Sequence, residues 1–119
     1  MTHALAIHSR TTPAGPVIEL SGDLDHHTTP QVRELLPGLD LGPGRQIVID
    51  LAQLAFCDSS GIAVLLAARN HALAADAAIV LAAVPERVSR IFRIVGLEEI
   101  FPTCPTAQAA ETAWTPPAR

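Results

Sequence analysis

The sequence of 119 residues contains no lysine, only two cysteines and no long apolar segment. Without lysine, the chain cannot form the Gly-x-x-x-x-Gly-Lys loop of nucleotide hydrolases. Two cysteines are too few for a disulfide framework or a zinc site, so we expect reduced thiols, with Cys57 buried beside Phe56. No apolar run approaches the ~20 residues that a membrane-spanning helix needs.

Positive charge is also scarce, because the formal net charge is -4. Nucleic-acid binding needs a basic surface, so we expect no direct contact with nucleic acid. The only basic cluster is Arg87, Arg90 and Arg93, which we interpret as the solvated side of an amphipathic helix. The first residues lack a basic region followed by an apolar one, so we expect no secretory signal, no membrane partner and a cytoplasmic location.

Apolar residues are abundant, at 49% of the chain, whereas charged residues make up 17%. This balance argues against disorder and favours one compact core. We expect a single domain over residues 1–114. The Pro-rich segment 115–119 is predicted to be a flexible tail.

Predicted strands and helices alternate along the chain. We predict strands at 4–8, 17–21, 46–51, 78–82 and 100–101, and helices at 28–38, 58–75, 85–95 and 106–114. A short Pro/Gly linker between the first two strands predicts a hairpin, so the first strand should be an antiparallel edge. The alternation that follows predicts an α/β fold with a mostly parallel sheet.

Helix ends are marked by specific residues. We expect Pro30 in the first turn of a helix that a threonine caps. Asp76 is predicted to take a left-handed conformation, and Gly96 followed by Leu97 predicts a helix stop. The apolar stripe of the long helix is predicted to include Leu73, and that of the next helix to include Val95.

The sequence Asp58-Ser59-Ser60-Gly61 stands between a strand and a long helix. Amides in the first turn of a helix lack carbonyl partners and create a positive end. Asp58 or Ser59 can therefore act as an N-cap. One of the two serines can instead accept a phosphate, whose charge the helix end can accommodate. The residues alone leave both interpretations open.

A nucleophilic serine is the alternative from enzyme chemistry. The Gly-x-Ser-x-Gly motif needs a glycine two residues before the serine, where this chain has Cys57 or Asp58. No spacing selects His26, His27 or His71 as a base. A serine hydrolase that uses Ser59 is therefore the less favoured hypothesis.

A second polar segment runs from Gly22 to Thr28 and contains Asp23, Asp25, His26 and His27. Consecutive histidines point in different directions, so we prefer a polar turn to a metal site and expect no cofactor. In a parallel sheet this segment and the Asp58 turn leave the same carboxyl edge, where functional sites gather.

Three segments together resemble the bacterial anti-sigma factor antagonists, which are single-domain members of the STAS family. They are residues 22–28, 50–61 and 90–97, and the resemblance covers about residues 4–113. It implies the STAS fold, with a mostly parallel sheet of four to five strands, an antiparallel edge strand and about four helices.

The resemblance also implies a phosphorylation switch. The unmodified antagonist binds an anti-sigma factor that is also a serine kinase, and so frees the sigma factor. Phosphorylation of the serine after the aspartate, here Ser59 with Ser60 as the fallback, abolishes binding, and a serine phosphatase reverses it. Asp58, Ser60 and Gly61 would form the switch turn. The implied partner-binding residues are Asp23, Asp25, His26, Ser59 and Ile62.

One alternative stays within the same family. The chain could be a STAS subunit of a lipid-transport or stress-signalling complex, which would bind an ATPase or a scaffold in place of a kinase. The sequence does not determine the oligomeric state.

Overall fold

The computed structural model describes residues 4–116. Residues 117–119 of the expected tail lie outside the described residues, so that expectation stays a prediction. The elements are β1 (Leu5–Thr12), β2 (Gly15–Leu24), α1 (Thr29–Leu35), the 3-10 helix η1 (Leu36–Gly38), β3 (Gln46–Cys57), α2 (Ser59–Ala74), β4 (Ala78–Ala82), α3 (Glu86–Val95), β5 (Thr103–Cys104) and α4 (Ala107–Ala113).

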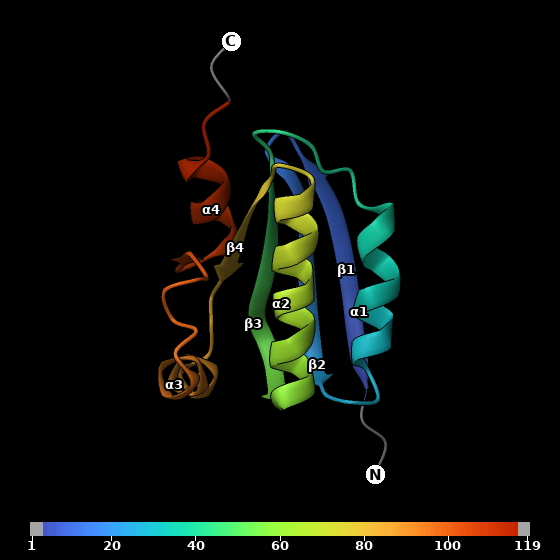
Figure 1. Cartoon of the computed structure of the whole chain (residues 1–119), viewed down its shortest axis with the longest axis vertical. Helices are drawn as coiled ribbons and strands as arrows, with labels where there is room; N and C mark the ends of the chain where they lie inside the picture. Colours follow the sequence, from blue (N-terminus) through green and yellow to red (C-terminus); the bar gives the residue numbers. More distant parts are fainter. Residues whose placement is uncertain (1–3, 117–119) are drawn as a thin grey trace.

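The strands form one sheet in the order β1-β2-β3-β4-β5. β1 runs antiparallel to β2, and all other neighbours are parallel, which confirms the predicted fold class and the edge hairpin. The hairpin turn needs Gly15, whose φ is +139° and whose added Cβ would lie 1.9 Å from the Gln46 carbonyl oxygen. Figure 1 shows α1 and α2 lying together in front of this sheet.

The main core lies between the sheet and the α1/α2 layer. Its largest fully buried residues include Ile18, Leu20, Leu24, Ile47, Ile49, Leu51 and Leu65. Because side chains alternate along a strand, their neighbours Val17 and Val48 face the other side. There they pack with Ala107 and Ala110 of α4 in a smaller cluster. The sheet is therefore covered on one face by α1 and α2, and over part of the other face by α4.

β3 is longer than the predicted strand, which ended at residue 51. Residues 53–57 remain paired with β2 across two register shifts, so the strand continues to Cys57. Cys57 is buried as predicted, whereas Phe56, beside which we expected it, is 46% exposed. Adjacent strand residues point to opposite faces, and this alternation separates the thiol from the ring.

The predicted ends of α2 and α3 are present, but one apolar residue of each helix is not buried as predicted. Asp76 has φ 57°, which confirms its predicted left-handed conformation, and Gly96 has φ 78° at the predicted helix stop. The Leu97 amide donates to the Phe92 carbonyl at 2.8 Å and completes the stop of α3. Leu73 is 50% exposed, and Val95 is also exposed, so both predictions of burial are wrong.

The predicted strand at residues 100–101 is wrong. Phe101 is buried and stacks on Phe92, with ring centroids 5.4 Å apart. The ring thereby belongs to the core beneath α3, and the short strand β5 follows two residues later. Within residues 4–116, no helix combines the length and the hydropathy that a bilayer span requires.

Candidate functional site

The turn between β3 and α2 is closed by Asp58. Its Oδ1 accepts a hydrogen bond from the Gly61 amide at 3.1 Å, and its carbonyl accepts from the Ile62 amide at 3.1 Å. Asp58 has an extended backbone and is the N-cap of α2. The capping role therefore falls to Asp58 rather than to Ser59, and the Ser59 hydroxyl is not needed for it.

Ser59 and Ser60 are the first two residues of α2. Ser59 is exposed, whereas Ser60 is half-buried. Amides at these first positions have no acceptor within the helix, and they concentrate the positive end of the helix dipole beside the Ser59 hydroxyl. A negative group attached to that hydroxyl would meet favourable electrostatics at this end of α2.

Gly61 brings α2 against the carboxyl ends of β2 and β3. A Cβ on Gly61 would lie 2.6 Å from the Cys57 Sγ and 2.7 Å from the Leu24 carbonyl oxygen. The same Leu24 carbonyl accepts a hydrogen bond from the Asp58 amide at 3.3 Å. The absence of a side chain at residue 61 therefore permits the close approach of the helix to both strands.

The polar segment 22–28 begins within the last residues of β2, which is longer than predicted, and it lies beside this turn, as the parallel topology predicts. Asp23 is in register with Phe56, and Leu24 with Cys57, across the β2–β3 pair. The two polar segments therefore share one edge of the sheet. Figure 1 places the end of β2, the end of β3 and the start of α2 together at the lower end of the molecule.

Asp25 organises the segment from within. It is only 4% exposed, and its Oδ1 accepts hydrogen bonds from the amides of His27 at 2.9 Å and Thr28 at 3.1 Å. The Thr28 hydroxyl accepts from the Asp25 amide at 2.9 Å and donates to the Asp23 carbonyl at 2.8 Å. This reciprocal arrangement is a polar turn, which is the interpretation that the sequence favoured over a metal site.

Thr28 precedes α1 but does not cap it. The threonine cap predicted for this helix is wrong, because the Thr28 hydroxyl is used within the preceding turn. Pro30 does occupy the first turn of α1, as predicted. Within residues 4–116, no group of three or more His, Cys, Asp or Glu side chains has the arrangement of a metal site.

The predicted partner-binding residues divide into two groups. Ser59 and His26 are exposed, and Asp23 is partly exposed. Asp25 and Ile62 are buried, with Ile62 only 7% exposed. The structure thus brings the five residues to one edge of the sheet, three at the surface and two beneath it.

Cys57 lies under the turn. Burial, and secondarily the negative charge of Asp58, raise the pKa of the Cys57 thiol to about 11. The thiolate is the nucleophilic form of cysteine, so these surroundings keep Cys57 unreactive near neutral pH.

Arg87 connects α3 to the strand that leads into the turn. Its guanidinium donates a hydrogen bond to the Ala55 carbonyl of β3. The side chains of Arg87, Arg90 and Arg93 are exposed, which agrees with their predicted position on the solvated side of a helix. The Arg87 contact could not be predicted from the sequence, because nothing in the spacing of α3 indicates how far β3 extends.

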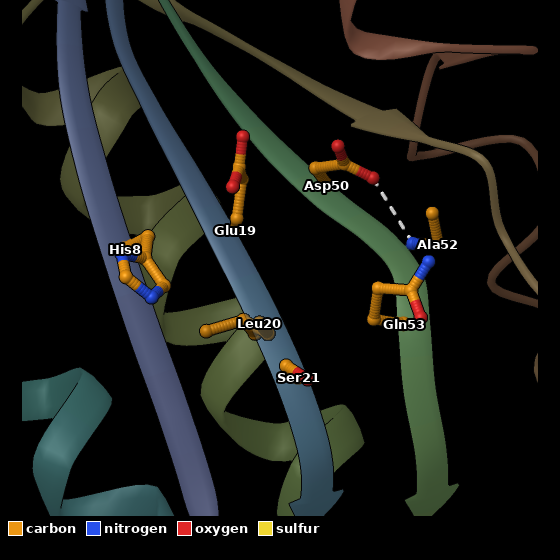
Figure 2. A pocket seen from close by; sticks show the side chains of 7 residues that line it. All are labelled: His8, Glu19, Leu20, Ser21, Asp50, Ala52 and Gln53. Atoms are coloured by element: carbon orange, nitrogen blue, oxygen red, sulfur yellow. Dashed lines mark hydrogen bonds between the residues drawn. The ribbon is translucent and has the colours of Figure 1, made fainter.

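A separate groove of about 360 Å³ lies on the sheet face that α1 and α2 do not cover. Figure 2 shows His8 of β1, Glu19 and Ser21 of β2, and Asp50 and Gln53 of β3 along this groove. The Asp50 carboxylate accepts a hydrogen bond from the Ala52 amide at 3.0 Å. Ser59 does not line the groove, so the sheet face and the α2 edge are distinct surfaces.

A family of known proteins matches most of this chain, including both polar segments. Residues 7–102 match the family described as "Mlab, STAS domain". The chain belongs to the STAS domain family. The anti-sigma-B factor antagonist of Listeria monocytogenes is 31% identical over 84 residues, which are 71% of this chain and 74% of the relative. The antagonist of the same name from Staphylococcus aureus is 25% identical over 71% of this chain and 78% of its own length.

Solved STAS structures share the architecture. A STAS domain anti-sigma-factor antagonist from Planctomyces limnophilus has a TM-score of 0.78 and 21% identity, over 92% of this chain and 97% of the other. The antagonist from Mycobacterium paratuberculosis has a TM-score of 0.75 and 23% identity, over 93% of this chain and 94% of the other. The unphosphorylated anti-sigma factor antagonist SpoIIAA has a TM-score of 0.71 and 23% identity, over 90% of this chain and 95% of the other. The predicted STAS fold is confirmed.

Proposed function

We propose that this STAS domain is an anti-sigma factor antagonist controlled by phosphorylation of Ser59. The unmodified protein binds an anti-sigma factor that is also a serine kinase, and a serine phosphatase reverses the modification. The names of the curated relatives support the antagonist role. The observation that carries the assignment to Ser59 is its exposure at the start of α2, with the capping role taken by Asp58.

Ser59 is a better acceptor than Ser60 for two reasons. A docking kinase needs access to the hydroxyl, and Ser59 is exposed whereas Ser60 is half-buried. A phosphate on Ser59 also lies beside the first amides of a helix of 16 residues. Such a helix end stabilises a negative group by about 0.3–1 kcal/mol at an exposed position.

The phosphate would weaken partner binding through charge. It adds about -1.5 to -2 charges at neutral pH next to the Asp58 carboxylate, at an edge that also carries Asp23. A partner surface that fits the unmodified edge would have to desolvate this dianion without a countercharge. A cost of about 1.4 kcal/mol already reduces affinity tenfold, and an unpaired charge at a desolvated contact costs more.

The proposed interface consists of exposed residues supported by buried ones. Ser59, His26 and Asp23 contact the partner directly. Asp25 fixes the backbone of residues 23–28 through its hydrogen bonds, and Ile62 packs beneath the first turn of α2. In this proposal Asp25 and Ile62 contribute by holding the surface in shape.

A second candidate is a STAS subunit of a lipid-transport or stress-signalling complex. It rests on the family description, which names Mlab and does not name an antagonist. In that case an ATPase or a scaffold would bind the same edge, and no kinase would modify Ser59. The chain would be a non-enzymatic binding module in both cases.

The two candidates are separated by a binding and phosphorylation experiment. Purified candidate anti-sigma kinases would be tested against the wild type, Ser59→Ala and Ser59→Asp, with Ser60→Ala as the matched control. We expect wild type, Ser59→Ala and Ser60→Ala to bind, and Ser59→Asp to bind at least about tenfold more weakly. With ATP present, the kinase should modify wild type and Ser60→Ala but not Ser59→Ala. Equal binding of Ser59→Ala and Ser59→Asp, or phosphate on Ser60, would contradict the proposal.

A further inference from the structure

β1 is an edge strand whose outer side has no partner within the described part of the chain. It spans Leu5–Thr12 and pairs only with β2. Its register with β2 is continuous over all eight residues, in contrast to the two register shifts between β2 and β3. The strand is therefore regular along its whole length.

The alternation of an antiparallel ladder identifies the backbone groups that point outward. The Asp23 amide donates to the Ala4 carbonyl at 3.0 Å, so Ala4 and every second residue after it direct their backbone groups to β2. The intervening residues direct their amides and carbonyls away from the sheet. These residues are Leu5, Ile7, Ser9 and Thr11. Between residues 4 and 116, none of these outward groups forms a hydrogen bond.

The edge lacks the features with which sheet proteins prevent edge pairing. Natural edge strands are interrupted by proline, bulges or charged side chains, lysine above all. β1 contains neither proline nor lysine, and its one fixed charge is Arg10. The Arg10 guanidinium forms ion pairs with Glu19 at 3.8 Å and with Glu111, which draw it over the sheet face and away from the edge.

We propose that β1 pairs with β1 of a second copy of this chain, antiparallel and about a two-fold axis at His8. This register places Ile7 opposite Ser9 of the second copy, and Leu5 opposite Thr11 of the second copy. Every outward amide and carbonyl of β1 then has a partner, and the two sheets form one continuous sheet.

The side chains permit this self-pairing. In the same register Arg10 lies opposite Ala6 of the second copy, so no two fixed charges of like sign face each other across the new pair. Leu5 faces Thr11, Ile7 faces Ser9 and His8 faces His8 of the second copy, so Arg10 is the only fixed charge of each strand at the contact. The backbone of the strand is thus complementary to itself, as a symmetric dimer contact requires.

Concentration-dependent hydrogen exchange tests this pairing on the unmodified chain. In dilute protein the amides of Ile7, Ser9 and Thr11 should exchange quickly, whereas those of His8 and Arg10 are protected by β2 at every concentration. In concentrated protein the outward amides should slow by about tenfold once nine-tenths of the chain is dimeric. Sedimentation should then report twice the 12.5 kDa mass of the chain. A monomer with fast outward amides up to ~1 mM protein would overturn the proposal.

A substitution at Ser9 tests the register. Ser9→Pro removes an amide that the monomer does not use, so the fold should survive while the dimer is lost. Ser9→Ala keeps the amide and should remain dimeric. If the proline variant fails to fold, Ser9→Lys serves instead, because a lysine at the edge opposes pairing without changing the backbone. A dimer that persists in a folded Ser9→Pro or Ser9→Lys variant would rule out this contact.

Discussion

At the scale of single residues, Cys57 illustrates how the proposed switch turn is isolated from competing chemistry. The thiol lies beneath Gly61, in the space that a side chain at residue 61 would need. Its neutral form is favoured by burial and by the adjacent Asp58 carboxylate. An ionised thiolate here would oppose any negative group on Ser59, so a protonated Cys57 suits the proposed function.

The protection of Cys57 leads to a prediction for its alkylation. With a pKa of about 11, against 9.0 for an ordinary thiol, its thiolate fraction at pH 8 is roughly a hundredfold smaller. Iodoacetamide should therefore label half-buried Cys104 well before Cys57, as followed by mass spectrometry of peptides. Because folding raises this pKa, the free energy of unfolding should fall as the pH rises from 9 to 11. Cys57→Ala should lack that fall, and equal labelling of the two cysteines would contradict the prediction.

Some residue roles could be predicted from the sequence and others could not. Aspartate and serine are both good N-caps, so only the extended backbone of Asp58 decides that it caps α2. The burial of Asp25 was not foreseen, because charged residues are rarely buried without partners. Its partners are backbone amides two and three residues away, and these are set by the turn itself.

At the scale of elements, α4 depends on two side-chain contacts with the start of β3 and the loop before it. It has only seven residues, too few to be stable alone. The Gln46 side-chain amide donates to the Ala110 carbonyl at 3.1 Å, and the Trp114 indole donates to the Gly44 carbonyl at 2.9 Å. These contacts satisfy a carbonyl near the helix end and fix the segment that follows.

The Gln46 contact predicts the stability of α4. Gln46→Leu should lower the free energy of unfolding by about 1–3 kcal/mol, because it leaves a buried carbonyl without its donor. Urea unfolding followed by circular dichroism measures this loss. Emission of Trp114, the one tryptophan, should shift to the red as α4 loosens. Gln53→Leu on the exposed part of β3 is the matched control and should change stability by less than about 0.5 kcal/mol. A Gln46→Leu variant with wild-type stability and emission would refute the role of this contact.

Local patterns predicted some elements accurately and failed where tertiary contacts decide. The apolar, β-branched run at residues 78–82 predicted both ends of β4 correctly. The Ala- and Leu-rich composition predicted α2 to within one residue at each end. The end of β3 was missed because its register shifts are a property of the pair with β2. The last strand was missed because Phe101 packs on Phe92, which lies in another element.

At the scale of the whole molecule, the sheet separates three surfaces. The Asp58 turn and residues 23–28 occupy the carboxyl edge. The groove that Glu19 and Asp50 line is on the sheet face that α1 and α2 do not cover. The outer side of β1 forms a lateral edge. Dimerisation through β1 would therefore not involve Ser59, but it would bring His8, at the β1 side of the groove, next to the second copy. Partner binding at the carboxyl edge and self-association should be independent properties of this chain.

The phosphate proposed for Ser59 should act locally, because the helix end can accept it without rearrangement of the core. Phosphorylation should shift backbone NMR signals of residues 23–28 and 56–62, whereas signals of β1 and β4 should stay in place. The first amides of α2 supply the stabilising field, which falls off within one turn. Ser59→Ala treated with the same kinase and ATP is the control and should keep its spectrum. Shifts spread across all strands would mean that the modification refolds the domain and does not simply change the charge of its partner-facing edge.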